Sequence, residues 1–173
     1  AEERERAIMS TTTLWSVKRT QTNRRNDPSQ EQEAKILDTL TDAGWTEQSV
    51  NSIQSAAQID KLSKGCVAHQ VQVRNSEADI AVRLRDGRLL AIEAKVSNST
   101  VNSIKRLIHE AGDKASNWRN EFGEQVIPAV VLSGVYGLKH LKEAQNEREM
   151  VIFWEHDMDR LVEFVEGVKM PSS

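Results

Sequence analysis

The feature that most constrains the fold is a β-hairpin predicted around Asp86-Gly87. Strand-like segments rich in β-branched or alternating apolar residues flank this pair at 78–84 and 89–96. A third such segment, 66–74, precedes them, because Val67, Val71 and Val73 alternate with polar residues. The chain is therefore expected to have three consecutive strands, of which the last two form an antiparallel hairpin, and later strands are added to this sheet.

Helices and further strands are predicted around these three strands. Apolar residues at helical spacing predict a helix over about 29–43, which starts at Asp27-Pro28-Ser29 and stops at Gly44. A long helix over about 100–120 follows a Ser/Asn/Thr cap. The nearly continuous apolar run 126–132 predicts a strand that is buried on both faces. The remaining elements are a helix over 137–148, a strand over 150–154 and a helix over 158–168, while 45–63 is ambiguous and could include a short helix at 52–59.

The resulting order is α-β-β-β-α-β-α-β-α. A hairpin followed by β-α-β crossovers predicts an α/β protein whose mixed β-sheet is flanked by helices. Residues 1–28 are largely polar and aperiodic, so we expect an N-terminal arm there and a single domain over 29–173.

Composition limits the classes of protein to consider. With 38% hydrophobic and 28% charged residues, the 173-residue chain is typical of one soluble globular domain. No apolar run approaches the roughly 20 residues of a membrane helix, and no secretory signal is visible. Cys66 is the single cysteine, which excludes a disulfide framework and favours a cytoplasmic location. We therefore expect no membrane partner.

Charge is distributed unevenly along the chain. The net charge is −3, but residues 61–119 carry 11 Lys/Arg against 6 Asp/Glu, whereas residues 141–173 carry 4 against 8. A basic segment that contains a few clustered carboxylates suits a metal site that must also attract phosphate. A solvated surface of mixed charge is the alternative interpretation.

The carboxylates of interest flank the hairpin. Glu77-Ala-Asp79 stands at the start of the first hairpin strand, and Glu93-Ala-Lys95 lies on the second, so we expect them on neighbouring strands at a sheet edge. A two-residue loop would place Glu93 opposite Ile80, on the core face.

A three-residue loop changes this register. With Gly87 in the left-handed position, such a loop pairs Leu84 with Arg88 and brings Asp79 directly across from Glu93. We predict this register, because glycine is the residue preferred at the third loop position. Two carboxylates and a lysine would then form one cluster able to hold a hard divalent cation.

An acidic-x-Lys triplet is not specific by itself, since about one is expected by chance in a chain of this length. Glu33-Ala-Lys35 is a second example, but it lies in a predicted helix, where residues two apart do not share a face. For Glu93-Ala-Lys95 the alternative to a catalytic role is a salt-bridged structural strand.

The spacing of Asp79, Glu93 and Lys95 resembles the PD-(D/E)xK nuclease superfamily, with Ala78 at the position of the motif's proline, which members of the superfamily often lack. The α-β-β-β-α-β order matches the restriction-endonuclease-like core of that superfamily. More narrowly, the segment 91–107 and the later Val-Ile-Phe-Trp-Glu-His at 151–156 resemble the XamI family of type II restriction endonucleases.

This resemblance implies a Mg²⁺-dependent type II restriction endonuclease that hydrolyses double-stranded DNA, works as a homodimer and uses no nucleotide cofactor. Asp79 and Glu93 would bind Mg²⁺, and Lys95 would hold or deprotonate the attacking water. Glu33 would assist as a fourth catalytic residue, with Glu31 as the competing choice, and Glu77 is either a spare ligand or a solvated charge.

The start of the helix after the motif offers candidate contacts to the DNA backbone, because helix N-termini and hydroxyl groups suit phosphate oxygens. These candidates are Ser99, Asn102, Lys105 and Arg106, and the alternative is an ordinary cap with a solvated face. Two other functions remain open: a repair or recombination nuclease such as a resolvase, and a non-catalytic DNA-binding module.

Overall fold

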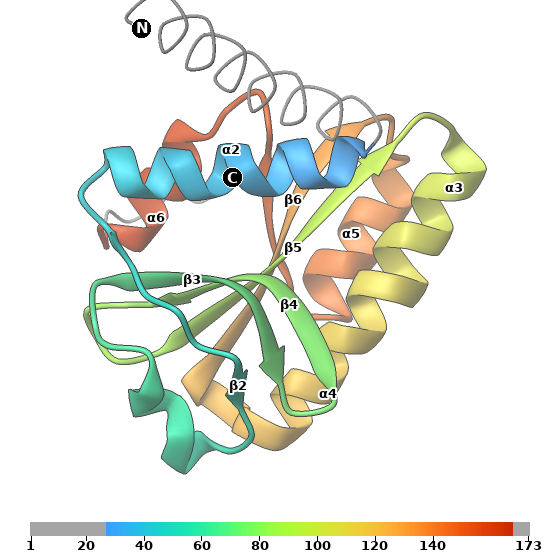
Figure 1. Ribbon diagram of the computed structural model, residues 1–173. Helices are drawn as coiled ribbons and strands as arrows, with labels where there is room; N and C mark the ends of the chain where they lie inside the picture. The colour runs from blue at the N-terminus through green and yellow to red at the C-terminus, as the bar shows by residue number, and fades with distance from the viewer. Residues whose placement is uncertain (1–26, 168–173) are drawn as a thin grey trace, which may run out of the picture.

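The computed structural model describes residues 27–167, so nearly all of the expected arm at 1–28 lies outside the described residues. A mixed sheet of seven strands occupies the centre, in the order β1-β3-β4-β5-β6-β7, and β2 also pairs with β3 (Figure 1). The strands are β1 Thr46–Glu47, β2 Ser52–Ile53, β3 Cys66–Val73, β4 Ser76–Arg83, β5 Leu89–Ser97, β6 Val126–Gly134 and β7 Val151–Trp154. Strands β3, β4 and β5 are antiparallel neighbours, whereas β6 and β7 add in parallel. The predicted hairpin and the mixed sheet are therefore confirmed.

Five α-helices cover the two faces of this sheet in the described part of the chain. They are α2 Pro28–Asp42, α3 Thr100–Ile104, α4 Gly112–Phe122, α5 Leu138–Asn146 and α6 Asp159–Val165. Helices α2 and α6 pack on one face through a core that includes Ile36, Leu40 and Leu161, while α3, α4 and α5 lie on the other (Figure 1). None of the described helices is long and apolar enough to span a bilayer.

Local chemistry explains where α2 begins. The side chain of Asp27 accepts a hydrogen bond of 3.0 Å from the backbone N–H of Ser29, and Pro28 occupies the first turn, where its missing N–H costs nothing. The helix closely matches the predicted 29–43. The ambiguous segment 45–63 forms β1, β2 and a 3₁₀ helix over Ala56–Lys61, in place of an α-helix.

The long helix predicted over about 100–120 is continuous, but its middle is irregular. Between α3 and α4, Lys105–Ala111 form a π-helical segment, η2, which widens the turn and which the sequence analysis did not predict. Trp118 of α4 anchors the far end of this helix against the sheet. Its side chain is only 1% exposed, and its indole N–H donates to the carbonyl of Val73 at 3.2 Å.

The hairpin register has the predicted form. The N–H of Leu84 donates to the carbonyl of Arg88 at 2.9 Å, and Gly87 has φ +99°, which a non-glycine residue adopts only with strain. The ladder continues from this turn to Ile80 opposite Ile92. The expectation of a sheet edge was wrong, because β4 and β5 are interior strands with neighbours on both sides.

Candidate active site

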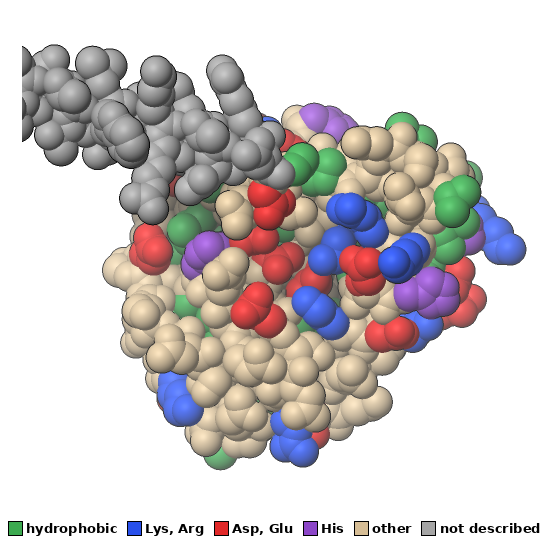
Figure 2. Space-filling view, turned by 45° about the vertical axis from the view of Figure 1, so that its right-hand side comes forward, with side chains coloured by type: hydrophobic (Ala, Val, Ile, Leu, Met, Phe, Trp, Pro, Cys, Tyr) green, Lys and Arg blue, Asp and Glu red, His purple; other side chains and the backbone are tan. Residues whose placement is uncertain are grey.

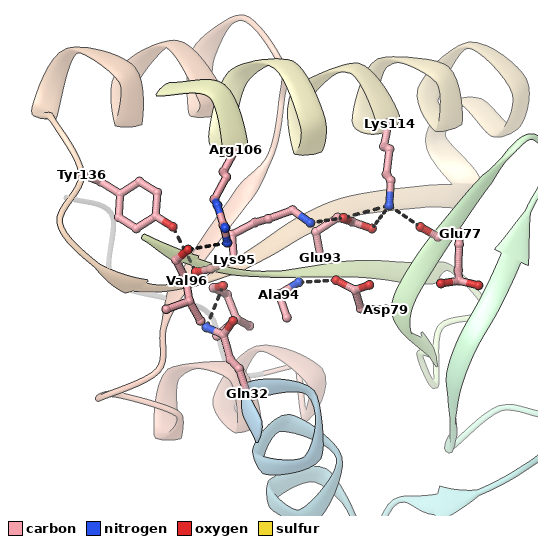
Figure 3. Close-up of polar contacts among 11 residues, drawn as sticks. Gln32, Glu77, Asp79, Glu93, Ala94, Lys95, Val96, Arg106, Lys114 and Tyr136 are labelled. Atoms are coloured by element: carbon pink, nitrogen blue, oxygen red, sulfur yellow. Dashed lines mark hydrogen bonds and ion pairs between the residues drawn. The ribbon is translucent and has the colours of Figure 1, made fainter. Parts of the chain in front are cut away.

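The predicted cluster lies where β4 separates from β5. The last paired residues of the two strands are Ile80 and Ile92, so the same register continued by one residue places Asp79 across from Glu93. Beyond this pair the backbone hydrogen bonds between β4 and β5 end, and a side chain takes their place. The Oδ2 atom of Asp79 accepts a hydrogen bond of 2.7 Å from the backbone N–H of Ala94 (Figure 3). On its other side Glu93 pairs with Val130 of β6, which fixes the position of the strand.

Two lysines bind the carboxylate of Glu93, which is fully buried. The Nζ of Lys95 lies 2.9 Å from Oε2, and the Nζ of Lys114 lies 2.9 Å from Oε1 and 3.0 Å from Oε2 (Figure 3). Lys95 reaches Glu93 along its own strand, whereas Lys114 descends from α4. A buried charge requires such partners, because an unpaired carboxylate in this position would be strongly destabilising.

Burial and neighbouring charges shift the pKa values of Glu93 and Lys95. Burial raises the pKa of Glu93, and the neighbouring Asp79 raises it further, while Lys95 and Lys114 oppose the change without cancelling it. For Lys95, burial lowers the pKa, but the carboxylates of Glu93 and Asp79 outweigh that effect and the net pKa is raised. Lys95 is therefore an ammonium group at neutral pH.

Sequence reasoning missed Lys114. Its ammonium also donates to the backbone carbonyl of Glu77 on β4 at 2.8 Å, so it bridges the gap between the separating strands. A signal was available in the sequence: Lys114 lies three residues after Ala111 and four before Trp118, both buried. A lysine on the buried stripe of a helix indicates a buried anion opposite it.

Glu33 approaches the cluster from α2. Its side chain is 9% exposed and accepts from Nε2 of His69 at 2.8 Å. Burial raises the pKa of Glu33, the hydrogen bond from His69 opposes this, and the charge of Asp79 raises it again. Of the two glutamates considered for this role, Glu33 is the one that faces the sheet, because Glu31 is exposed.

Glu33→Gln is expected to stabilise the protein increasingly as pH rises from the ordinary glutamate pKa of 4.5 through the raised pKa of Glu33 in the folded state. A carboxyl whose pKa is raised in the folded state binds more protons there than in the unfolded chain, so ionisation at higher pH costs stability. Thermal melts of both proteins across this range measure the effect. At pH below the unfolded pKa both states hold the proton, and the difference in melting temperature should shrink. A difference that does not change with pH would contradict the electrostatic cause.

The four candidate DNA contacts lie near the start of the long helix but differ in their environment. Ser99 is the N-cap of α3, and its Oγ accepts the N–H of Asn102 at 3.3 Å. Asn102 and Lys105 are exposed. Arg106 is half-buried and donates to the carbonyl of Val96 at 2.7 Å, so part of its guanidinium holds β5 (Figure 3).

Tyr136 supports the same strand from the loop after β6. Its hydroxyl donates to the carbonyl of Lys95 at 3.0 Å, and its ring packs edge-on against Trp154. Burial raises the pKa of Tyr136 to about 12, so it remains a neutral donor. Side chains thus satisfy several backbone groups of β5 beyond the end of its ladder with β4.

The surface near these elements combines both signs of charge. Figure 2 shows acidic and basic side chains gathered side by side across the middle of one face. Within residues 27–167, no group of three or more His, Cys, Asp or Glu side chains is arranged to hold a metal ion. The acidic residues that could contribute oxygen ligands at the cluster are Asp79 and Glu93, with Glu33 close enough to influence Asp79.

The fold and site together define an α/β protein with a carboxylate–lysine cluster at the centre of a mixed sheet. The family model described as XamI restriction endonuclease matches residues 1–154, so the chain belongs to the XamI restriction endonuclease family. It is 41% identical over 133 residues to the type II restriction enzyme XamI of Xanthomonas campestris pv. amaranthicola. The match covers 74% of this chain and 46% of that relative, so the chain spans about half the relative's length. No solved structure is significantly similar to the chain.

Proposed function

We propose that this chain is the catalytic part of a type II restriction endonuclease, which hydrolyses phosphodiester bonds of double-stranded DNA with Mg²⁺. The observation that carries the proposal is the meeting of Asp79, Glu93 and Lys95 where β4 separates from β5. Membership of the XamI family supports it, since the related protein is named a type II restriction enzyme. A restriction-endonuclease-like core over 29–173 is part of the proposal and agrees with the α-β-β-β-α-β order of the main elements.

The donor set at the cluster fits a hard divalent cation. Asp79 and Glu93 are neighbouring carboxylates, and each is an oxygen ligand of the type Mg²⁺ prefers. Burial raises the pKa of Glu93, and the charge of Asp79 raises it further; a bound cation would offset both effects. Asp79 and Glu93 would hold Mg²⁺, which when bound polarises a phosphoryl oxygen and lowers the pKa of a water molecule.

The chain's own residues define the remaining chemistry. Because the carboxylates keep Lys95 protonated, its ammonium acts as a donor that orients the attacking water and stabilises negative charge on the phosphoryl group. This favours electrostatic stabilisation over proton abstraction by Lys95. Glu33 is the better candidate to accept a proton from the water, because burial raises its pKa and a carboxylate with a raised pKa is a stronger base.

Recognition of DNA belongs to the same proposal. Asn102 and Lys105 are exposed near the start of the long helix, and we assign them, with Ser99 and Arg106, to contacts with the phosphate backbone. A homodimer would supply two active sites for the two strands of a twofold-symmetric target. The single reduced cysteine, Cys66, is consistent with action in the cytoplasm.

A plasmid digest at low salt tests the proposal. We expect discrete bands with Mg²⁺, no cleavage with EDTA, and at least a hundredfold slower cleavage by Asp79→Asn, which removes one metal-binding charge while keeping the shape. Circular dichroism of the variant would verify that its fold is retained. Smearing or nicking would favour a repair or recombination nuclease instead. Absence of cleavage by the folded wild-type protein would favour a non-catalytic DNA-binding module.

A further inference from the structure

Lys114 makes three hydrogen bonds at the cluster, although the proposed reaction gives it no role. Its ammonium donates to both oxygens of Glu93, at 2.9 and 3.0 Å, and to the backbone carbonyl of Glu77 at 2.8 Å. An ammonium group has three N–H donors, so these acceptors account for all of them. Figure 3 shows Lys114 between Glu93 on one side and Glu77 on the other.

The carboxylate of Glu93 is therefore shared before any cation arrives. Lys95 contacts Oε2, and Lys114 contacts both oxygens, so no oxygen of this buried group is free of a positive partner. A divalent cation that binds Glu93 must take an oxygen that Lys114 already contacts. The cation must also approach the positive ammonium of Lys114, and burial of the site weakens the screening of their repulsion by water and salt.

We propose that Lys114 is a resident counter-ion of Glu93, which competes with the divalent cation and thereby sets the cation affinity of the site. This inference rests on the proposed function, because it takes Glu93 to be a metal ligand. In the absence of the cation Lys114 balances the buried charge of Glu93 and holds both of its carboxylate oxygens. It is a positioning residue, since its contacts are with Glu93 and β4.

The structure also provides a place for Lys114 when a cation takes its position. The carbonyl of Glu77 is a neutral acceptor on a separate strand, so the ammonium can release Glu93 and keep this second hydrogen bond. The side chain of Lys114 is 29% exposed, which leaves solvent available to the displaced group, whereas that of Lys95 is 14% exposed. Lys114 is thus better placed than Lys95 to yield to the cation.

Cation binding measured by calorimetry tests the inference, with Mg²⁺ as the probe and the protein freed of metal by EDTA and dialysis. We expect Lys114→Met to lower the Kd by about tenfold, because one unit charge beside a doubly charged ion is removed. Lys114→Gln removes the same charge but keeps an N–H donor for Glu77, and it should tighten binding similarly if the methionine variant fails to fold. Lys114→Arg retains the charge and should leave the Kd within about threefold of wild type.

Two controls separate this inference from the proposed function. Lys142→Met removes a positive charge from the exposed surface of α5 and should leave the Kd unchanged. Asp79→Asn should abolish binding; if wild type binds no Mg²⁺, or binds it regardless of Asp79, the proposed site itself is wrong. If Asp79 is required but both neutral Lys114 variants bind Mg²⁺ no tighter than wild type, only the counter-ion role is overturned.

Discussion

Lys95→Met is expected to reduce the rate of DNA cleavage about a thousandfold or more at saturating Mg²⁺, while the protein stays folded. The methionine side chain is similar in length to that of lysine and can fill the same buried space. The ammonium that would stabilise the transition state is lost. Lys114 still balances Glu93 in this variant, with both of its contacts near 3 Å, so the carboxylate keeps a partner. Single-turnover cleavage of a plasmid carrying the target measures the effect.

Lys142→Met, on the exposed surface of α5, is the matched control for this loss of one positive charge and should cleave at the wild-type rate. Cleavage by Lys95→Met within about tenfold of wild type would show that Lys95 serves the structure and not the reaction. A loss of activity that is fully explained by the fraction of unfolded Lys95→Met protein would lead to the same conclusion.

Trp118→Ala is expected to lower the free energy of unfolding by about 3–5 kcal/mol, a large part of the total for a domain of this size. The indole fills the core between α4 and the sheet with 1% exposure, and its N–H bond to Val73 is lost together with the packing. Urea unfolding followed by circular dichroism gives the difference directly. Because Lys114 lies one turn away on the same helix, cation affinity should change as well.

Trp118→Phe separates packing from hydrogen bonding. Phenylalanine keeps most of the apolar contact and removes the donor to Val73, which should cost about 1–2 kcal/mol. If Trp118→Ala cost no more than this, the core around α4 would be able to collapse into the cavity, and the anchoring role of Trp118 would be wrong.

Sequence alone predicted the elements and the register with good accuracy, because both depend on local chemistry. Glycine at the third hairpin position selects a three-residue loop, and the parity of a strand then decides which side chains meet. The run 126–132 was correctly predicted as a strand buried on both faces. Asp79 and Glu93 came together for these reasons.

What the sequence analysis did not predict depends on tertiary contacts. The position of β4 and β5 inside the sheet is set by which strands pair later, and the hairpin itself contains no information on this. The π-helical segment Lys105–Ala111 contains neither glycine nor proline, and the sequence analysis did not interpret Gly112, which directly follows it, as a sign of an irregular helix. Lys114 was missed because its partner, Glu93, is 21 residues away in the chain and only the packing of α4 brings them together.

The end of the β4–β5 ladder has a consequence for how this protein could evolve. Beyond Ile92, three side chains bind the backbone of β5 along the segment that bears Glu93 and Lys95: Asp79 at Ala94, Tyr136 at Lys95 and Arg106 at Val96. A strand held by main-chain ladders on both sides can move only if the sheet is disrupted. Here single substitutions in side chains can shift the reactive segment by small steps while β6 keeps it in register. The reactive geometry is thus adjustable by point mutation without loss of the fold.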